Sequence, residues 1–365
     1  MARVRHTRGR VVEVESLSEL DRRIEAGARS MAGWRVASVD LRERGDLLRG
    51  CEVAGATFMG CRFAPGDEAE VEARGALVFP PIPDAPVDAY RAGLYSPREL
   101  YDDASYPVTL DARAYGWSQE HHDHDALLAR TLHDHAIDVA LAGWVEGQGQ
   151  RMVGLMGGHA VTRAEPAYAE AARLAWRLGS GLVVATGGGP GAMEAANLGA
   201  YLCGHDAEVL DEAVAHLASV PTFRPSVQAW VAAAFEVLDR CPDGADSLGI
   251  PTWHYGHEPP NVFATAIAKY FRNATREAIL LQLCNAGIVF LPGSGGTVQE
   301  IFQDACENYY ADESSVAPMV LVGSMYWTKE VPAWPLLKAL ARGRSMEPHL
   351  HLVDTVDEAA AVLRA

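Results

Sequence analysis

The sequence predicts an α/β protein built on a doubly wound, mostly parallel sheet with helices on both faces, plus a smaller N-terminal region. From residue 152 onward, short apolar runs alternate with amphipathic helical segments, the pattern that parallel sheets produce. Glycine-rich turns follow three of these runs, at 157–158, 186–191 and 292–297. With 365 residues, the chain is long enough for a full hydrophobic core and a second region.

The N-terminal region is expected to end at 86, within the proline cluster 80–86, because prolines continue neither a helix nor a central strand. Inside this region apolar residues recur every five positions: Leu48, Val53, Phe58 and Phe63, with Cys51, Ala56 and Cys61 two residues before the last three. The rhythm resembles a short pentapeptide-repeat coil. An irregular β segment is the alternative, since four turns are few for a solenoid.

Residues 87–145 are expected to form a helical linker. Ser96 can cap a helix that has Pro97 at its first position. The histidine-rich stretch 121–124 lies in polar, helix-like sequence and lacks a tight ligand motif such as H-E-x-x-H. We interpret it as a solvated helix face and predict no metal site.

The third region, 146–365, carries the predicted sheet. The expected strands are 152–156, 182–185, 288–291 and 319–322, and the expected helices are 166–178, 192–202, about 260–283, 298–309 and 356–363. Parallel strands present their carboxyl ends at one edge, so the three glycine turns would surround one crevice. Residues 205–259 interrupt the alternation and look like an insertion.

The glycine turns are candidate anion-binding loops. Glycine lets backbone N–H groups turn toward a ligand, and a following helix N-terminus favours negative charge. A plain tight turn is the alternative for each loop alone. The candidate phosphate- or nucleotide-binding residues are Gly157, Gly158, Gly188, Gly189, Gly191, Met193, Glu194, Gly293, Ser294, Gly295, Gly296 and Thr297.

The second loop also matches a dinucleotide-binding fingerprint as text. Gly187, Gly189 and Ala192 satisfy G-x-G-x-x-G/A. However, that fingerprint belongs after the first strand of its unit, and here another strand precedes it. The acidic residue at the required distance, Asp206, has no apolar run leading into it. A dehydrogenase is therefore disfavoured.

Two charged residues are candidates for catalysis. Glu300 closes a capping box with Thr297, which is a structural alternative to a role at the anion site. Arg276 follows Lys269 and Arg272 at spacings that place three cations on one helix face. Such a stripe is usually solvated surface, but this segment leads into the third glycine loop, and Arg276 lies nearest to it.

Two of the loops resemble the signature motifs of the LONELY GUY (LOG) family. Residues 292–300, Pro-Gly-Ser-Gly-Gly-Thr-Val-Gln-Glu, are similar to its P-G-G-x-G-T-x-x-E motif, and residues 187–193 are similar to its G-G-G-x-x-G-x-M loop. The resemblance covers about residues 146–330. The chain departs from the family pattern at Ser294, which replaces the second glycine, and in the insertion 205–259.

The resemblance implies a Rossmann-like fold and hydrolysis of nucleoside 5′-monophosphates to a free base and ribose 5-phosphate, with no metal or other cofactor. It implies that Glu300 and Arg276 are the catalytic residues and that the loop ending at Thr297 holds the 5′-phosphate. Because the chain resembles the longer bacterial nucleosidases, ordinary nucleotides are favoured over cytokinin nucleotides. A non-catalytic nucleotide-binding or sensing protein is the alternative.

Composition narrows the partners. A formal net charge of −17 repels nucleic-acid backbone, so no nucleic-acid partner is expected. No apolar run approaches the length of a membrane span, and the six cysteines are scattered without a C-x-x-C pair. We therefore expect a cytoplasmic protein with no membrane partner, and a homo-oligomer because such folds often pair through helices.

Overall fold

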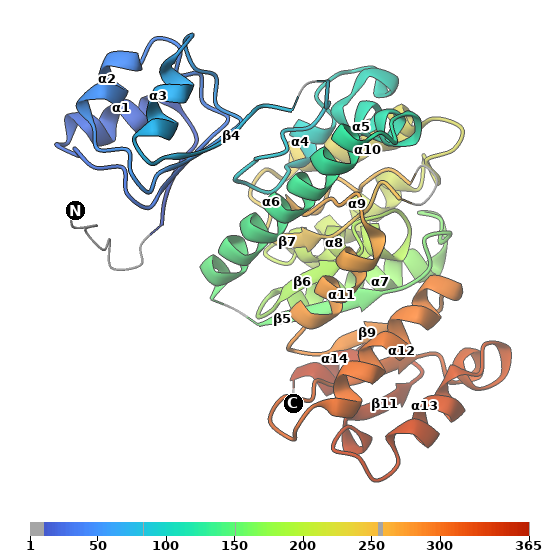
Figure 1. Cartoon of the computed structure of the whole chain (residues 1–365). Coiled ribbons are helices and arrows are strands. Elements are labelled where there is room, and N and C mark those ends of the chain that lie inside the picture. Colours follow the sequence, from blue (N-terminus) through green and yellow to red (C-terminus); the bar gives the residue numbers. More distant parts are fainter. Residues whose placement is uncertain (1–10, 83, 150, 255–257, 365) are drawn as a thin grey trace. The chain divides into compact units, whose positions relative to one another are not determined.

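The computed structural model describes residues 11–82, 84–149, 151–254 and 258–364 (Figure 1). The chain divides into two compact units. The N-terminal unit contains Met1–Gly93 and Trp117–Gly143, and the sheet unit contains Leu94–Gly116 and Trp144–Ala365. Residues 87–145, the expected linker, are divided between the two units.

Residues 12–79 of the N-terminal unit form a short solenoid of β–α coils. Its four strands form a parallel sheet in the order β1-β2-β3-β4, and a helix follows each of the first three strands. The elements are β1 Val12–Val14, α1 Leu17–Glu25, β2 Trp34–Ala37, α2 Gly45–Gly50, β3 Thr57–Met59, α3 Asp67–Ala73 and β4 Leu77–Phe79. The strand registers give coils of 22, 22 and 20 residues, which is the range of strand–helix repeats.

The predicted pentapeptide coil is therefore replaced by a longer repeat. Leu48 lies in α2, which a pentapeptide coil would not contain, and Phe58 lies in β3. The five-residue rhythm nevertheless marks side chains that point into the core. Six of its seven residues are buried and Phe63 packs against them, so the spacing reports inward-facing positions of one coil rather than its architecture.

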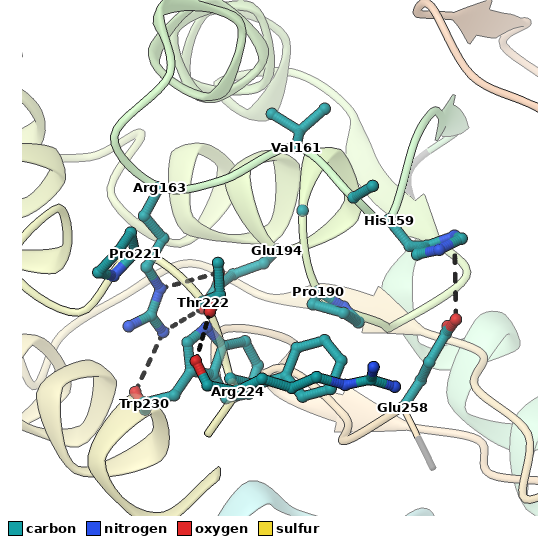
Figure 2. A pocket seen from close by; sticks show the side chains of 13 residues that line it. His159, Val161, Arg163, Pro190, Glu194, Pro221, Thr222, Arg224, Trp230 and Glu258 are labelled. Carbon is teal, nitrogen blue, oxygen red and sulfur yellow. Dashed lines mark hydrogen bonds and ion pairs between the residues drawn. The ribbon is translucent and has the colours of Figure 1, made fainter. Parts of the chain in front are cut away.

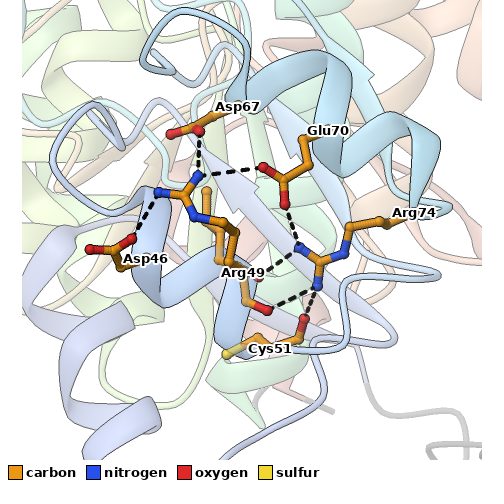
Figure 3. Close-up of polar contacts among 7 residues, drawn as sticks. Asp46, Arg49, Cys51, Asp67, Glu70 and Arg74 are labelled. Atoms are coloured by element: carbon orange, nitrogen blue, oxygen red, sulfur yellow. Dashed lines mark hydrogen bonds and ion pairs between the residues drawn. The ribbon is translucent and has the colours of Figure 1, made fainter.

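Two arginines connect neighbouring coils of the solenoid (Figure 3). Arg49 of α2 pairs with Asp67 of α3 at 2.9 Å and with Asp46 at 2.9 Å. Arg74 bonds the Cys51 carbonyl and the Leu48 carbonyl. Arginine has several donors in a fixed plane, so each side chain satisfies groups on two successive coils.

Helices follow the solenoid, as expected. They are α4 Pro97–Leu100, the 3₁₀ turn Tyr106–Val108, α5 Leu110–Glu120 and α6 His124–Gln148. The predicted cap is confirmed, because the Ser96 side chain accepts a hydrogen bond from the Glu99 N–H and Pro97 opens the helix. No helix of the described ranges is long and apolar enough to cross a membrane.

The sheet unit confirms the predicted fold class, a Rossmann-like α/β arrangement. Its seven strands are parallel in the order β11-β10-β9-β5-β6-β7-β8. The strands are β5 Met152–Met156, β6 Val183–Thr186, β7 Ser247–Gly249, β8 Ala266–Ile267, β9 Ile288–Phe290, β10 Met319–Val322 and β11 Leu350–Val353. Strands β5 and β6 are buried along their whole length, as a sheet covered on both faces requires.

The helices cover both faces of this sheet. They are α7 Pro166–Gly179, α8 Ala192–Tyr201, α9 Ala207–Leu217, α10 Val227–Arg240, α11 Asn273–Leu283, α12 Gly295–Tyr310, α13 Ala333–Ala341 and α14 Val356–Arg364. Helices α7, α8 and α14 pack together, and so do α11, α12 and α13. Strand order runs one way from β5 to β8 and the other way from β9 to β11, so right-handed crossovers place these two groups on opposite faces.

The reversal creates a topological switch point between β5 and β9. The loops after these two strands leave toward opposite faces, which opens a crevice beyond their carboxyl ends. The glycine loops at 157–158 and 292–297 follow β5 and β9 directly. The fold therefore brings two of the three predicted loops to the place where ligands of such sheets bind.

One predicted helix is wrong in its extent. The segment expected to be helical from about 260 contains β8, and α11 begins only at Asn273. Lys269 and Arg272 therefore precede the helix and do not form a stripe with Arg276. Lys269 is fully buried and its ammonium bonds Asp111 at 2.5 Å, because an unpaired charge in that position would cost several kcal/mol.

Candidate functional site

The third glycine loop is a helix N-terminus that begins earlier than expected. Helix α12 starts at Gly295 with Ser294 as its N-cap residue, so the predicted capping box of Thr297 and Glu300 is wrong. Ser294 has a φ of −94°, which any L-residue adopts without strain. A serine at the position of the family's second glycine is thus accommodated by the backbone.

The start of α12 presents free donors. Among the residues that the structure describes, the N–H groups of Gly295, Gly296 and Thr297 have no hydrogen-bond partner, as the first turn of a helix leaves them. No atom lies within 4 Å of the space where a Cβ on Gly295 or Gly296 would be. The N-terminus is therefore open to a ligand, and the helix dipole favours an anion there.

The loops after β5 and β9 touch through their backbones. The Gly158 N–H donates to the Pro292 carbonyl at 3.2 Å. A Cβ on Gly293 would collide with Thr297 Oγ1 and stand 3.1 Å from the Gly158 nitrogen. Gly157 is equally confined, because a Cβ there would meet Leu291 Cβ at 3.1 Å. These glycines let the two loops approach closely enough to share one crevice.

That crevice, which we call the switch-point crevice, has a volume of about 270 Å³. Its lining comes from the β5 loop, the β9 loop and the segment after β10: Gly158, His159, Ala160, Val161, Glu165, Pro292, Gly293, Ser294 and Tyr326. Five of these nine residues are glycines or have small apolar side chains: Gly158, Ala160, Val161, Pro292 and Gly293. The other four, His159, Glu165, Ser294 and Tyr326, carry polar side chains.

The second loop is held by a buried polar network. Gly188 has a φ of +70°, a conformation that glycine adopts at little cost. Its N–H donates to Thr186 Oγ1 at 2.9 Å, and Asn261 bonds the carbonyls of Gly188 and Gly189. Asn261 is fully buried, so the conformation of this loop depends on a residue that is distant in the sequence.

Met193, which follows the second glycine loop, packs against Gly187. A Cβ on Gly187 would meet the Met193 sulfur at 2.8 Å and Arg276 Nη1 at 3.3 Å. The Met193 side chain and the Arg276 guanidinium therefore both lie against Gly187. The predicted second loop and the predicted arginine are brought together, whereas Gly191 contacts the first loop, at the His159 carbonyl.

Arg276 has a free hydrogen-bonding group. Its Nε donates to Asn273 at 3.1 Å, but Nη1 is buried and has no partner among the described residues. The neighbouring Glu277 does not supply one, since its carboxylate accepts from Asn273 and Gln299 at 2.6 Å each. A buried donor left unpaired costs about 1–3 kcal/mol, which a ligand oxygen at this position would recover.

Glu300 faces the same region without a partner. Its carboxylate forms no hydrogen bond or ion pair within the part of the chain that the structure describes, and the residue keeps partial solvent exposure. Burial of the carboxyl group among protein atoms raises the pKa of Glu300 to about 7, Arg276 lowers it and Glu277 raises it. A carboxyl group poised near neutral pH beside a cation is typical of acid–base chemistry.

A second carboxyl group lies one turn further along α12. Asp304 is 5% exposed, and burial raises its pKa to about 8, with a further contribution from Glu307. At pH 7 the folded protein therefore holds this group protonated, whereas the unfolded chain ionises it. Stability is lost as the pH rises above the unfolded value of 3.8.

We therefore expect Asp304→Asn to stabilise the protein at pH 7 by on the order of 2 kcal/mol, because asparagine is neutral in both states. The gain should be much smaller at pH 4, where the unfolded aspartate is already partly protonated. Urea unfolding of both proteins at pH 4 and pH 7 measures the difference. A gain of equal size at both values would show that ionisation is not its cause.

The predicted ligand residue Glu194 lies in a buried ion pair. Arg163 binds its carboxylate through Nε at 3.0 Å and through Nη2 at 2.5 Å, and both side chains are 1% exposed. Arg163 also donates to the Trp230 carbonyl at 3.1 Å and stacks over its ring at 4.6 Å. Figure 2 shows Arg163 directed at both residues. The carboxylate of Glu194 is thus already satisfied.

This pair forms one side of a second cavity, of about 350 Å³. The insertion supplies a wall with Pro221, Thr222, Phe223, Arg224 and Trp230, and the first two glycine loops supply the opposite wall. Figure 2 also shows His159 facing Glu258, with 3.8 Å between His159 Nδ1 and a carboxylate oxygen. Segment 205–259 is thus part of the fold, contributing β7, α9 and α10, and it lines a cavity next to the site.

Sequence reasoning missed three residues that shape the site. Arg163 carried no signal, because its partner is 31 residues away. Asn261 lay in a segment expected to be helical. Tyr326 follows β10 in the same way that the glycine loops follow their strands, and this position could have identified it.

The fold and the site together define a class: a Rossmann-like α/β protein whose switch-point crevice lies at the N-terminus of a helix. The same helix carries Glu300, whose pKa is lowered by Arg276. No protein-family model matches the chain, and no curated protein matches it in sequence. Within the described ranges, no group of three or more histidine, cysteine, aspartate or glutamate side chains could hold a metal ion.

Among solved structures, the chain is similar to a molybdenum cofactor carrier protein from Chlamydomonas reinhardtii, with 18% identity and a TM-score of 0.37. It is also similar to a molybdenum cofactor binding protein from the phototrophic bacterium Rippkaea orientalis, with 15% identity and a TM-score of 0.35. Each match covers 59% of this chain and 96% of the other. Values at this level say nothing of the ligand of this chain.

Proposed function

We propose that the protein is a nucleoside 5′-monophosphate phosphoribohydrolase, which hydrolyses the N-glycosidic bond to a free base and ribose 5-phosphate. The observation that carries the proposal is the electrostatic interaction of Arg276 with Glu300, which lies on the helix whose N-terminus is open to an anion. Neither the Glu300 carboxylate nor Arg276 Nη1 has a partner among the described residues. The resemblance of both loops to the LOG motifs agrees with this assignment.

The proposed chemistry uses these groups in turn. The N–H groups at the start of α12 hold the 5′-phosphate, which converts remote binding energy into positioning of the ribose. As the bond to the base lengthens, its electron pair leaves with the base and positive charge develops on the ribose. The Glu300 carboxylate stabilises that charge and accepts a proton from the water that attacks C1′. That proton ends on the departing base.

Arg276 is placed to hold the substrate. Its free Nη1 lies beside Gly187, and a guanidinium donates to phosphate or ribose oxygens more readily than a neutral side chain does. Its charge also favours the ionised form of Glu300. In this proposal Arg276 both orients the nucleotide and keeps the glutamate available as a carboxylate.

Base release from a panel of nucleoside 5′-monophosphates, followed by chromatography, tests the proposal. We expect release of free base and ribose 5-phosphate from at least one nucleotide, and none from the corresponding nucleosides, which lack the phosphate. Calorimetric titration of the same panel runs in parallel. Tight binding without release at any substrate would favour the alternative, a nucleotide-binding or sensing protein, over the enzyme.

The pKa of Glu300 predicts how activity depends on pH. The ionised carboxylate is the active form, and its pKa is raised to about 7. We therefore expect kcat to rise about tenfold per pH unit below 7 and to level off above 8. Initial rates at saturating nucleotide between pH 5 and 9 measure this profile. A rate that is flat across this range would remove Glu300 ionisation from the mechanism.

A further inference from the structure

Tyr326 reaches the anion loop from a different part of the sheet unit. Strand β10 ends at Val322, and the chain turns at Gly323, whose φ is +97°. The π-helical turn η2 then spans Tyr326–Glu330. Such turns are rare and are frequent at functional sites. From its first residue, the Tyr326 hydroxyl donates to the Gly293 carbonyl at 2.8 Å.

This hydrogen bond determines which group the loop presents on its other side. The peptide unit between Gly293 and Ser294 is planar, and its carbonyl and its N–H point in opposite directions. With the carbonyl directed at Tyr326, the Ser294 N–H must point away from it. That N–H has no partner in the described part of the chain, and it is one residue before the free donors at the start of α12.

The loop conformation needs this constraint because glycine alone does not supply one. Gly293 has no Cβ to restrict its backbone, so its peptide unit can rotate more easily than that of other residues. A rotated unit would turn the carbonyl oxygen toward the anion site, where its negative partial charge repels phosphate. The hydrogen bond from Tyr326 thus determines whether this peptide presents an N–H, which attracts phosphate, or a carbonyl oxygen, which repels it.

The Tyr326 ring is itself fixed in place. It packs edge-on against Trp327, with ring centroids 4.9 Å apart and an interplanar angle of 90°, a favoured geometry for aromatic pairs. Trp327 is fully buried, and its backbone N–H donates to the Gly323 carbonyl at 3.0 Å. The hydroxyl is therefore held at a constant position relative to the sheet.

We propose that Tyr326 is a positioning residue for the anion site, orienting the Gly293–Ser294 peptide so that its N–H joins the donors that bind a phosphate group. The tyrosine does not act on the reacting atoms. The inference rests on the proposed function only in taking the ligand to be a phosphate monoester, because the peptide orientation is a property of the loop itself. It also accounts for Tyr326 lining the switch-point crevice.

Tyr326→Phe removes the hydroxyl and keeps the ring. We expect inorganic phosphate and ribose 5-phosphate to bind about 3- to 10-fold more weakly to the variant, the range that loss of one hydrogen bond produces. The KM of the best nucleotide substrate should rise by the same factor, while kcat changes less than twofold. Isothermal titration calorimetry and initial-rate kinetics measure the two quantities.

Tyr310→Phe is the matched control, because Tyr310 lies at the end of α12 and is 81% exposed. It should bind phosphate as the wild type does. Unchanged phosphate affinity in Tyr326→Phe, or a fall in kcat with KM constant, would overturn the inference. Weakened phosphate binding in a protein that releases no base would instead uphold it and refute the hydrolase, so the two proposals fail separately.

Discussion

Glu300→Gln is expected to lower kcat for base release by at least about a thousandfold while nucleotide binding stays within a few-fold of the wild type. Glutamine cannot carry the charge that stabilises the developing cation, and it is a far weaker base toward the attacking water. Because Glu300 has no hydrogen-bond partner among the described residues, the substitution breaks no contact. Stability should not fall, since the neutral amide avoids the cost of a buried charge.

The control for this variant lies on the same helix. Glu307→Gln makes the same chemical change at an exposed position of α12, and we expect its kcat to remain within twofold of the wild type. Single-turnover base release, with binding measured by calorimetry, resolves both variants. A Glu300→Gln protein that keeps a tenth or more of the wild-type kcat would remove Glu300 from the catalytic role.

Glu194→Gln is expected to destabilise the protein strongly. The substitution leaves the Arg163 guanidinium buried without its counter-charge, and breaking a buried pair in this way costs about 3–5 kcal/mol. The two side chains are 1% exposed each, so water cannot replace the carboxylate. Denaturant unfolding monitored by fluorescence measures the loss, and Trp230, over which Arg163 stacks, lies close enough to report it.

An exposed pair provides the comparison. Asp211→Asn breaks the ion pair with Arg173, whose side chains are 55% and 52% exposed, and should change stability by less than about 1 kcal/mol. If Glu194→Gln were equally mild but weakened nucleotide binding tenfold, Glu194 would be a ligand residue rather than a structural one. That result would restore the role that the motif suggests for it.

The parts of the sheet unit that could be predicted are those whose local sequence is compatible with only one kind of secondary structure. Strands 152–156 and 319–322 were predicted with the bounds that the structure has, because each is an apolar run between polar, turn-forming segments. The loop after β9 was predicted because glycines directly behind a strand have few other uses. Its conformation was not, since the helix begins three residues before Val298.

The segment around Lys269 shows why other parts failed. Residues 262–271 are almost all buried, so their apolar pattern has no period that separates a helix from a strand and loop. The charge of Lys269 suggested exposure, and only the distant Asp111 explains its burial. The solenoid failed similarly, because a five-residue spacing of core positions is compatible with more than one coil shape.

The candidate site could be predicted as a set of residue types but not as a set of contacts. The sequence places Arg276 and Glu300 on either side of a strand, and the approach of Arg276 to Gly187 depends on strand order. Arg163 and Tyr326 act through partners that are 31 and 33 residues away. Such pairings follow from the topology of the sheet, which local sequence does not specify.

The proposed hydrolysis is tested most directly by the sugar product formed in water enriched in heavy oxygen. Mass spectrometry of a reaction with a nucleoside 5′-monophosphate should show ribose 5-phosphate that carries one heavy oxygen at C1, together with unlabelled base. The unlabelled base shows that the oxygen of water does not enter the base. Because the C1 oxygen of ribose 5-phosphate exchanges with water through the open-chain aldehyde, ribose 5-phosphate incubated alone in the same water is the control. Release of inorganic phosphate, or recovery of the nucleotide intact with every base tested, would contradict the account.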